Sequence, residues 1–406
     1  MMHCGCTRAD PGRRLDSTVV TTTGAQGPLA GLRVIELAGI GPVPFAAMLL
    51  AELGADVVRV DRPDGGGLLA GALSGLHRSR PSVAVDLKHP DGPEVVLRLL
   101  DGADVLLEGW RPGVTERLGL GPTTCLRRNP GLIYGRMTGW GQDGPWAQRA
   151  GHDITYAAIT GALHLVGPPQ RPVVPANVLA DFGGGALYLL VGVLAALHSR
   201  RSTGVGQVVD AAMVDGAASL ISMLFAMYGR GLWRDERGVN MLDGGLPFYD
   251  TYRCADGRFV AVGPLEPQFF AAFLDGLGLT EREDLRAGQW DPATWADQRR
   301  LFTARFATRT RDQWAEHFEG TEACVAPVLG LGEAPEHPHL VARGIFTEVD
   351  GAVQPRVAPR FSATPAREPS PSRAAGADTR DILLAKGFSG DEVDALLAGG
   401  VVVQTG

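Results

Sequence analysis

The feature that most constrains the fold is a strand–helix–strand pattern near the start of the chain. Residues 32–37 (LRVIEL) and 55–60 (ADVVRV) are apolar runs of strand length. Between them, residues 43–53 have helical apolar spacing that ends at Gly54. Because two strands joined by a crossover helix run parallel with a right-handed connection, this unit predicts a parallel sheet.

More units of the same kind follow. Strands are predicted at residues 83–87, 104–107 and 132–136, with a helix at 90–100. The first half of the chain is therefore predicted to be a Rossmann-like α/β domain. Its Gly139–Gly144 segment has the form G-x-G-x-x-G, but it does not follow the first strand and Pro145 stands where a helix should begin, which argues against a nicotinamide site.

With 406 residues the chain is too long for one ordinary core, and a second pattern begins near residue 240. Residues 252–262 read as a hairpin with Asp-Gly in the turn, and a helix is predicted from Glu266. Capping boxes are predicted at Thr280 and Thr310. The predicted organisation is a disordered extension (1–25), a large domain (26–228), a linker (229–245), a small α+β domain (246–340), a crossing linker (341–378) and C-terminal helices that pack on the large domain (379–406).

Composition narrows the class of protein. A net charge of −7 argues against nucleic acid as a partner. Five scattered cysteines do not form a disulfide framework and favour the cytoplasm, and Cys4-Gly5-Cys6 lacks the second pair that a metal site needs. The apolar run 186–197 is too short to span a bilayer, so no membrane association is expected. Residues 207–228 read as a helix with methionines on it, which are typical of core or of an adaptable acyl-binding surface.

One stretch, residues 149–198, collects titratable groups. It contains His152, Asp153 and Asp181, the last followed by three glycines. An Asp at a helix start followed by glycines would leave backbone N–H groups approachable. Acid–base groups beside free donors are what proton transfer next to a carbonyl requires. Taken alone, His152 is more typical of a loop or cap residue than of a catalytic one, and Asp181 is more typical of a helix N-cap.

Basic residues follow the predicted strands. Each alone would be an ordinary solvated charge, but several at strand ends of an open α/β sheet favour a polyphosphate ligand in the crevice there. The residues are Arg59, Arg62, Arg78, Arg80, Lys88, Arg111 and Arg117.

Together these motifs resemble the family III CoA transferases, and within that family the branch that racemises acyl-CoA thioesters. The resemblance extends from residue 28 to the end of the chain. It implies an interlocked homodimer of Rossmann-like large domains and small α+β domains, with CoA on the large domain and the site closed by the partner's small domain. No cofactor beyond the CoA of the substrate and no metal is implied. The segments that carry it are 57–63, 85–88, 110–119, 138–142, 150–154, 180–185, 252–263, 266–270 and 324–328.

The resemblance also implies roles for residues in an epimerisation at carbon 2 of 2-methylacyl-CoA thioesters. His152 and Asp181 match the two groups that remove and return the α-proton through an enolate. Glu266 matches the carboxylate that holds the His152 tautomer, and the N–H of Asp153 matches the donor to the enolate oxygen. The positions that match CoA contacts are Arg62, Val85, Asp86, Leu87, Lys88, Gly109, Arg111, Arg117, Ala150, Gly151, Ile154 and Thr155.

Two alternatives remain at this stage. A true CoA transferase would use Asp181 as a nucleophile, forming an acyl anhydride and then an aspartyl-CoA thioester. Such enzymes lack a histidine at position 152 and usually carry a glycine run where 263–267 (GPLEP) stands, which favours the racemase. A non-catalytic acyl-CoA-binding protein would have no use for His152, Asp181 and Glu266. Branched fatty acyl, sterol-derived and 2-arylpropionyl groups all fit the sequence equally well.

Overall fold

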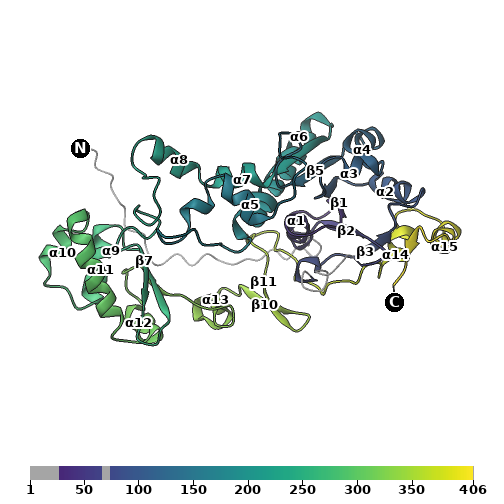
Figure 1. Ribbon diagram of the computed structural model, residues 1–406. Helices are drawn as coiled ribbons and strands as arrows, with labels where there is room; N and C mark the ends of the chain where they lie inside the picture. The colour runs from purple at the N-terminus through teal and green to yellow at the C-terminus, as the bar shows by residue number, and fades with distance from the viewer. Residues whose placement is uncertain (1–26, 66–73, 406) are drawn as a thin grey trace.

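The computed structural model describes residues 27–65 and 74–405. The extension predicted for residues 1–25, with its Cys4-Gly5-Cys6 sequence, lies outside these described residues. The molecule is elongated, with a seven-stranded sheet and its helices at one end and a three-stranded sheet with its helices at the other (Figure 1).

The large sheet has the strand order β12-β3-β2-β1-β4-β5-β6. The first six strands pair in parallel, and the five strands predicted from the first half of the chain are confirmed. The order of β1 to β6 is that of the doubly wound fold, whose ligand crevice opens where β1 and β4 meet. The strands are β1 Arg33–Leu37, β2 Asp56–Asp61, β3 Ser82–Val85, β4 Val105–Glu108, β5 Ile133–Thr138, β6 Gln207–Ala212 and β12 Val402–Val403.

The helix predicted over residues 207–228 is wrong in its first part. Gln207–Ala212 is β6, which pairs with β5 along its whole length. The run Val208-Val209 suits a strand, and pairing with an open sheet edge outweighs the helical spacing of the methionines that follow. Helix begins only at Met213, as α7 (Met213–Leu220) and α8 (Ser222–Gly229).

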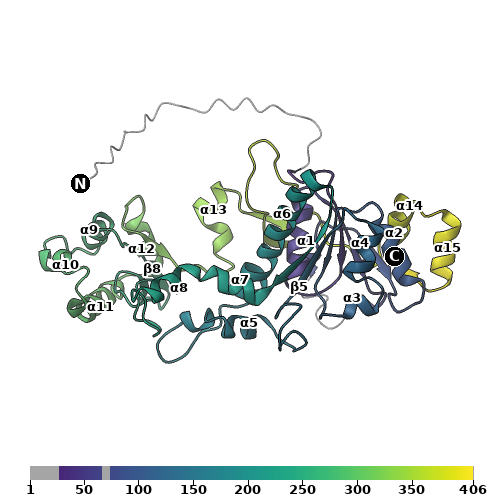
Figure 2. The same ribbon diagram turned by 90° about the horizontal axis from the view of Figure 1, so that it is seen from above.

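Two layers of helices cover the two faces of the large sheet. The first layer, called here the tail face, comprises α2 (Gly92–Leu100), α4 (Pro122–Arg128), α14 (Thr379–Ala385) and α15 (Gly390–Ala398). The second, called the α6 face, comprises α1 (Pro42–Glu52), α5 (Asp153–Ile159), η3 (Val178–Ala186), α6 (Leu187–Thr203) and α7. Each layer packs on its own apolar core, and Figure 2 shows the two layers on opposite sides of the sheet.

The end of the chain returns to the large domain. The two short helices predicted there, separated at Gly387, are confirmed as α14 and α15, with Gly387 at φ 86°. The strand after them, β12, was not predicted. It pairs antiparallel with β3, and the N–H of Asp86 donates to the carbonyl of Val401 (2.9 Å). The last residues therefore cover an edge of the sheet that would otherwise be open.

The small domain packs three strands against helices around an aromatic core. The predicted hairpin is confirmed as β7 and β8, and the Thr310 capping box is confirmed by hydrogen bonds to Gln313 in both directions. The Thr280 box is wrong, because residues 279–282 form a turn and helix starts only at Glu283. The elements are β7 Asp250–Arg253, β8 Phe259–Val262, α9 Pro267–Gly276, α10 Glu283–Ala287, α11 Pro292–Phe306, α12 Arg311–Phe318 and β9 Val325–Pro327.

Short elements complete the chain. Between the small domain and the returning tail lie η4 Ala334–Glu336, α13 Pro338–Ala342 and the hairpin of β10 Phe346–Val349 and β11 Ala352–Pro355. Within the large domain lie η1 Ser74–His77, α3 Val114–Arg117 and η2 Leu163–Leu165.

Elements η3 and α6 form one continuous helix over Val178–Thr203. By length and composition it could cross a membrane, and a third (33%) of its most apolar window is buried. It is longer than the apolar run noted in the sequence because the apolar residues of η3 precede it. Here one side packs on the sheet through Leu189 and Val193, whereas Val191 and Leu194 on the other side are exposed.

Candidate active site

The carboxyl ends of the parallel strands lie together along one border of the sheet, called here the carboxyl edge. Four of the predicted basic positions lie in the loops along this carboxyl edge. Arg62 follows β2, Lys88 follows β3, Arg111 follows β4, and Arg117 ends α3. All four side chains are exposed and have no ion pair within the part of the chain that the structure describes. They can therefore attract a phosphate-bearing ligand to this edge.

Three other arginines that the sequence suggested for the same purpose are not available. Arg59, Arg78 and Arg80 are buried in ion pairs with Asp61 (2.7 Å), Glu52 (2.5 Å) and Glu36 (3.4 Å). Arg78 also donates to the carbonyl of Pro355 (2.8 Å), and Arg59 to that of Arg373 (2.9 Å). A buried charge requires such partners. Arg59 and Arg78 therefore anchor the returning segment, Arg80 is held by the carbonyls of Pro44 and Leu76, and none of the three is exposed to a ligand.

The remaining predicted CoA positions lie along the same edge. Val85 ends β3, and Asp86 and Leu87 follow it in a turn where the Asp86 carboxylate accepts the N–H of Lys88 (2.9 Å). Gly109 lies directly after β4, and a Cβ there would come within 2.9 Å of Val43, so glycine lets the backbone approach closely. The last four positions flank His152: Ala150, Gly151, Ile154 and Thr155.

His152 stands at the start of α5 with its side chain exposed. The hydroxyl of Thr155 accepts the N–H of His152 (3.0 Å) and donates to its carbonyl (2.7 Å), which fixes the backbone. Within residues 27–65 and 74–405 the imidazole itself has no hydrogen bond or ion pair. The ring is therefore oriented by its backbone and free to exchange a proton.

Asp181 does not stand at a helix N-cap, as the sequence suggested, but inside the π-helix η3. π-helical turns are rare and are often found at functional sites. Burial has the largest effect on the Asp181 carboxyl and raises its pKa. The hydrogen bond that Asn177 donates to it (3.4 Å) lowers the pKa. The charge of Asp153 raises the pKa again, and His152 lowers it. The net direction is upward, so Asp181 keeps its proton to a higher pH than an exposed Asp would.

The three glycines after Asp181 serve packing and do not leave donors bare. A Cβ on Gly184 would lie 2.5 Å from the nitrogen of Ala217, and one on Gly216 would lie 1.7 Å from the carbonyl oxygen of Gly184. Helices η3 and α7 therefore touch backbone to backbone. The N–H groups of Ala180 and Asp181 are both taken by the carboxylate of Asp153 (2.8 Å each).

Sequence reasoning missed two residues beside Asp181. Gly41, at the start of α1, has φ 72°, and a Cβ there would lie 3.4 Å from Oδ2 of Asp181. Tyr156 is buried against Trp140 (ring centroids 4.7 Å apart), and its pKa is raised by burial and by the charge of Asp181. The available signal for Gly41 was its place in the Gly-Pro turn after the first strand, where doubly wound sheets bind ligands.

Glu266 lies in the small domain, exposed at the start of α9. In the described chain no hydrogen bond or ion pair joins it to His152, and both views show α9 and α5 in different parts of the molecule (Figures 1 and 2). One subunit therefore does not assemble the three predicted acid–base residues.

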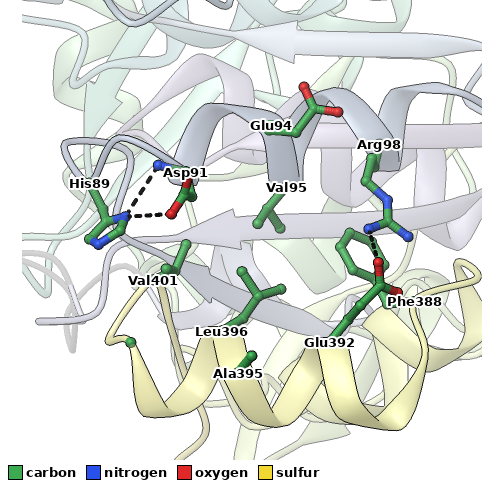
Figure 3. Close-up of a pocket in the computed structure, with 11 residues that line it drawn as sticks. His89, Asp91, Glu94, Val95, Arg98, Phe388, Glu392, Ala395, Leu396 and Val401 are labelled. Carbon is green, nitrogen blue, oxygen red and sulfur yellow. Dashed lines mark hydrogen bonds and ion pairs between the residues drawn. The ribbon is translucent and has the colours of Figure 1, made fainter.

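Two hollows of the described surface differ in their relation to the predicted site. The larger, about 540 Å³, lies between α2 and α15 on the tail face and holds none of the predicted site residues. His89 and Asp91 lie at one of its ends, and Arg98 and Glu392 at the other (Figure 3). The second, about 460 Å³, begins at the end of α5 and is lined by residues that include Ile159, Phe225, Tyr228 and Trp233. Only the second adjoins the helix that His152 begins.

No group of three His, Cys, Asp or Glu side chains that could hold a metal ion occurs among the described residues.

Comparison with known proteins connects this site to a family. The model of CoA-transferase family III matches residues 29–379. The chain belongs to this family. Alpha-methylacyl-CoA racemase of Mus musculus is 47% identical over 369 residues, which cover 90% of this chain and 95% of the relative. The beta subunit of succinyl-CoA--L-malate CoA-transferase of Chloroflexus aurantiacus is 33% identical, covering 91% and 95%.

Solved structures agree with the family III assignment. A CaiB/BaiF family protein from Brucella suis superposes with a TM-score of 0.78 at 26% identity, covering 89% of this chain and all (100%) of that one. The parallel central sheet and mixed α/β architecture described above are thus those of the family.

Proposed function

We propose that this family III protein is a racemase of 2-methylacyl-CoA thioesters. The observation that carries the proposal is the pairing of two proton-transfer groups: the free imidazole of His152 and the carboxyl of Asp181, joined through Asp153. The identity of 47% to alpha-methylacyl-CoA racemase supports this choice over a transferase, for which the identity quoted above is 33%.

The reaction removes one proton from carbon 2 of the acyl group and adds one proton to the same carbon. One of the pair, His152 or Asp181, takes the α-proton, and the electron pair of the C–H bond becomes an enolate on the thioester. The other group then donates a proton to the opposite face of the same carbon. The N–H of Asp153, at the first position of α5, has no intrahelical acceptor and is the donor proposed for the enolate oxygen.

CoA is proposed to bind along the carboxyl edge of the sheet. The exposed side chains of Arg62, Lys88, Arg111 and Arg117 supply positive charge for its phosphates. A Cβ at Gly109 would come within 2.9 Å of Val43, and one at Gly151 within 2.5 Å of Tyr156, so these glycines let the loops beside the proposed CoA site pack closely on the domain. The hollow at the end of α5 is the proposed place for the acyl group, because most of its lining side chains are apolar and it adjoins the helix that His152 begins.

The protein is further proposed to act as an interlocked homodimer. Large apolar side chains are exposed on α6, α7, α8 and the loop that follows, and exposed apolar patches of this kind often mark interaction surfaces. A second copy lying on this surface would cover it and would bring the partner's Glu266 toward His152. The side chains include Val191 (64% exposed), Leu220 (49%), Met223 (57%), Phe225 (55%), Tyr228 (55%) and Leu232 (67%).

Deuterium exchange tests the function directly. Each enantiomer of a 2-methylacyl-CoA is incubated with the protein in D₂O, with a free carboxylic acid as a possible acceptor in a parallel sample. Incorporation of one deuterium at carbon 2 with inversion, from either enantiomer, is the expected result. CoA transfer to the acid without exchange, together with hydroxylamine trapping at Asp181, would establish the transferase instead. Tight CoA binding without either reaction would mean that the protein binds acyl-CoA but does not catalyse a reaction on it.

A further inference from the structure

The carboxylate of Asp153 is placed unusually for a residue beside an active-site histidine. The residue is 94% buried, being 6% exposed. Its Oδ1 accepts two hydrogen bonds of 2.8 Å, from the N–H groups of Ala180 and Asp181. Its Oδ2 is buried and has no hydrogen-bond partner in the described structure. Buried carboxylate oxygens ordinarily have partners, so an unpartnered one calls for an explanation.

This carboxylate joins the two elements that carry the acid–base pair. Asp153 follows His152 directly and is the first residue of α5. The two N–H groups that it accepts belong to the first turn of η3, and one of them is the N–H of Asp181 itself. The Asp153 side chain therefore sets the distance between the turn that holds His152 and the turn that holds Asp181.

We propose that the carboxylate of Asp153 is a positioning residue of the proton-transfer pair: it fixes Asp181 relative to His152 and holds a second negative charge beside Asp181. This inference rests on the proposed racemase function. It assigns to the side chain a task separate from that of the Asp153 N–H, which is the proposed donor to the substrate oxygen.

The charge has a consequence for protonation. Burial raises the pKa of Asp181, Asn177 lowers it, Asp153 raises it and His152 lowers it. Elements α1, α6, α7, β5 and β6 also pack on η3, and none of their charged groups is among those that shift this pKa. Glu52 of α1 pairs with Arg78, Arg136 of β5 pairs with Glu108, and Asp210 of β6 accepts the N–H of Gln142. Asp215 of α7 is exposed, and Arg200 and Arg201 lie in the last turn of α6. The neutral phenol of Tyr156 completes the surroundings. Asp153 is thus the one carboxylate that keeps Asp181 protonated to a higher pH.

A racemase of this kind works when the pair holds a single proton, shared as HisH⁺ with Asp⁻ or as His with AspH. The rate therefore falls at acid pH, where a second proton binds. Removing the charge of Asp153 makes that second proton bind only at lower pH. The acid limb of the pH–rate profile must then move toward lower pH.

Asp153→Asn removes the charge and keeps an oxygen that can accept the same two N–H groups. We expect the rate of deuterium exchange to fall about 10-fold, since small misplacements of reacting groups cost up to ~10²-fold. The acid limb should move down by about one pH unit, as loss of a neighbouring charge typically requires. The KM for the thioester should stay within about two-fold, because the Asp153 side chain is not proposed to touch CoA.

Two variants separate this role from a structural one. Asp153→Glu keeps the charge but moves it, so the rate should fall while the acid limb stays at its wild-type pH. Asp215→Asn removes an exposed charge from α7 and should change neither. A wild-type acid limb in folded Asp153→Asn, or a shifted one in Asp153→Glu, would overturn the inference alone. Absence of exchange in the wild-type protein would overturn the proposed function, and this inference with it.

Discussion

The two faces of the large sheet are built differently. On the tail face the charged groups have partners: Arg98 lies over the ring of Phe388 (3.5 Å) and pairs with Glu392 (3.0 Å), which itself completes the capping box of α15. On the α6 face a π-helix replaces an α-helix, a buried carboxylate oxygen of Asp153 has no partner in the described chain, and apolar side chains such as Val191 are exposed.

The contrast separates stability from function within one domain. On the tail face the charged groups named above are paired, whereas the element that carries Asp181 departs from regular α-helix and packs against an unpartnered carboxylate oxygen. Strained or unsatisfied groups persist in a folded protein when surrounding structure holds them, and they are found preferentially at functional sites. The α6 face should therefore be sensitive in activity, and the tail face in stability.

The largest effect is expected from His152→Ala. An acid–base group typically contributes 10²-fold or more to the rate, so exchange at carbon 2 should fall by at least about 10². The melting temperature and CoA affinity should stay close to wild type, because the His152 side chain is exposed and buries little apolar surface. Exchange at more than a tenth of the wild-type rate would remove His152 from the mechanism.

The exposed apolar surface of the α6 face is tested next, with Val191→Lys. Val191 is 64% exposed on α6, and a charge there should prevent the proposed contact with a second copy. Light scattering should show monomers, and exchange should fall about 10-fold or more because the partner's Glu266 is lost.

Val353→Lys is the matched control for that surface. Val353 is almost equally exposed (60%) but lies in the β10–β11 hairpin. It should leave both mass and activity unchanged. A monomeric wild-type protein with full activity would contradict the dimer proposal.

Gly41→Ala tests the approach of α1 to Asp181. A Cβ there would lie 3.4 Å from Oδ2 of Asp181, at a φ of 72° that alanine disfavours by about 1–2 kcal/mol. Exchange should fall about 10-fold. Gly31→Ala carries the same strain (φ 87°) with nothing within 4 Å, so it should cost similar stability and leave the rate unchanged. Equal rates in the two variants would show that strain alone matters.

The sequence predicted the strands of the Rossmann-like half well, because buried parallel strands are continuous apolar runs that need no partner to be recognised. It did not predict β6, since pairing with β5 decided between strand and helix there. The two-residue β12 was missed for the same reason: Val402-Val403 is a strand only because β3 offers a free edge.

For the site, the sequence identified His152 and Asp181 but not how they are connected. The hydrogen bonds of Asp153 to η3 join residues 27 and 28 positions apart, and no local pattern encodes them. The buried ion pairs of Arg59, Arg78 and Arg80 also look like surface charges in sequence, because their partners come from other elements. Which arginines remain free is a property of tertiary packing.

On the tail face, Arg98→Ala should affect only stability. It removes a cation–π contact with Phe388 and an ion pair with Glu392, both partly exposed, worth together about 1 kcal/mol. The melting temperature should fall by about 2 °C while exchange stays within two-fold of wild type. A loss of activity at unchanged stability would mean that the hollow beside Arg98 takes part in function.

The smallest predicted effect is a change in melting temperature near pH 8 that has opposite signs for variants on the two faces. The pKa of Asp181 is raised from its ordinary 3.8, mainly by burial, so its charge destabilises the fold above that pH. Asp181→Asn should raise the melting temperature by about 1–2 °C near pH 8 and have no effect below pH 3.8.

On the tail face the carboxyl of Asp378 has the opposite shift. Burial raises its pKa, but the hydrogen bonds from Arg373 and from the N–H of Ser82 outweigh burial and lower the pKa. Asp378→Asn should therefore lower the melting temperature near pH 8, and this loss should disappear as the pH falls through the lowered pKa. If both variants changed the melting temperature in the same direction near pH 8, the proposed difference between the two faces would be contradicted.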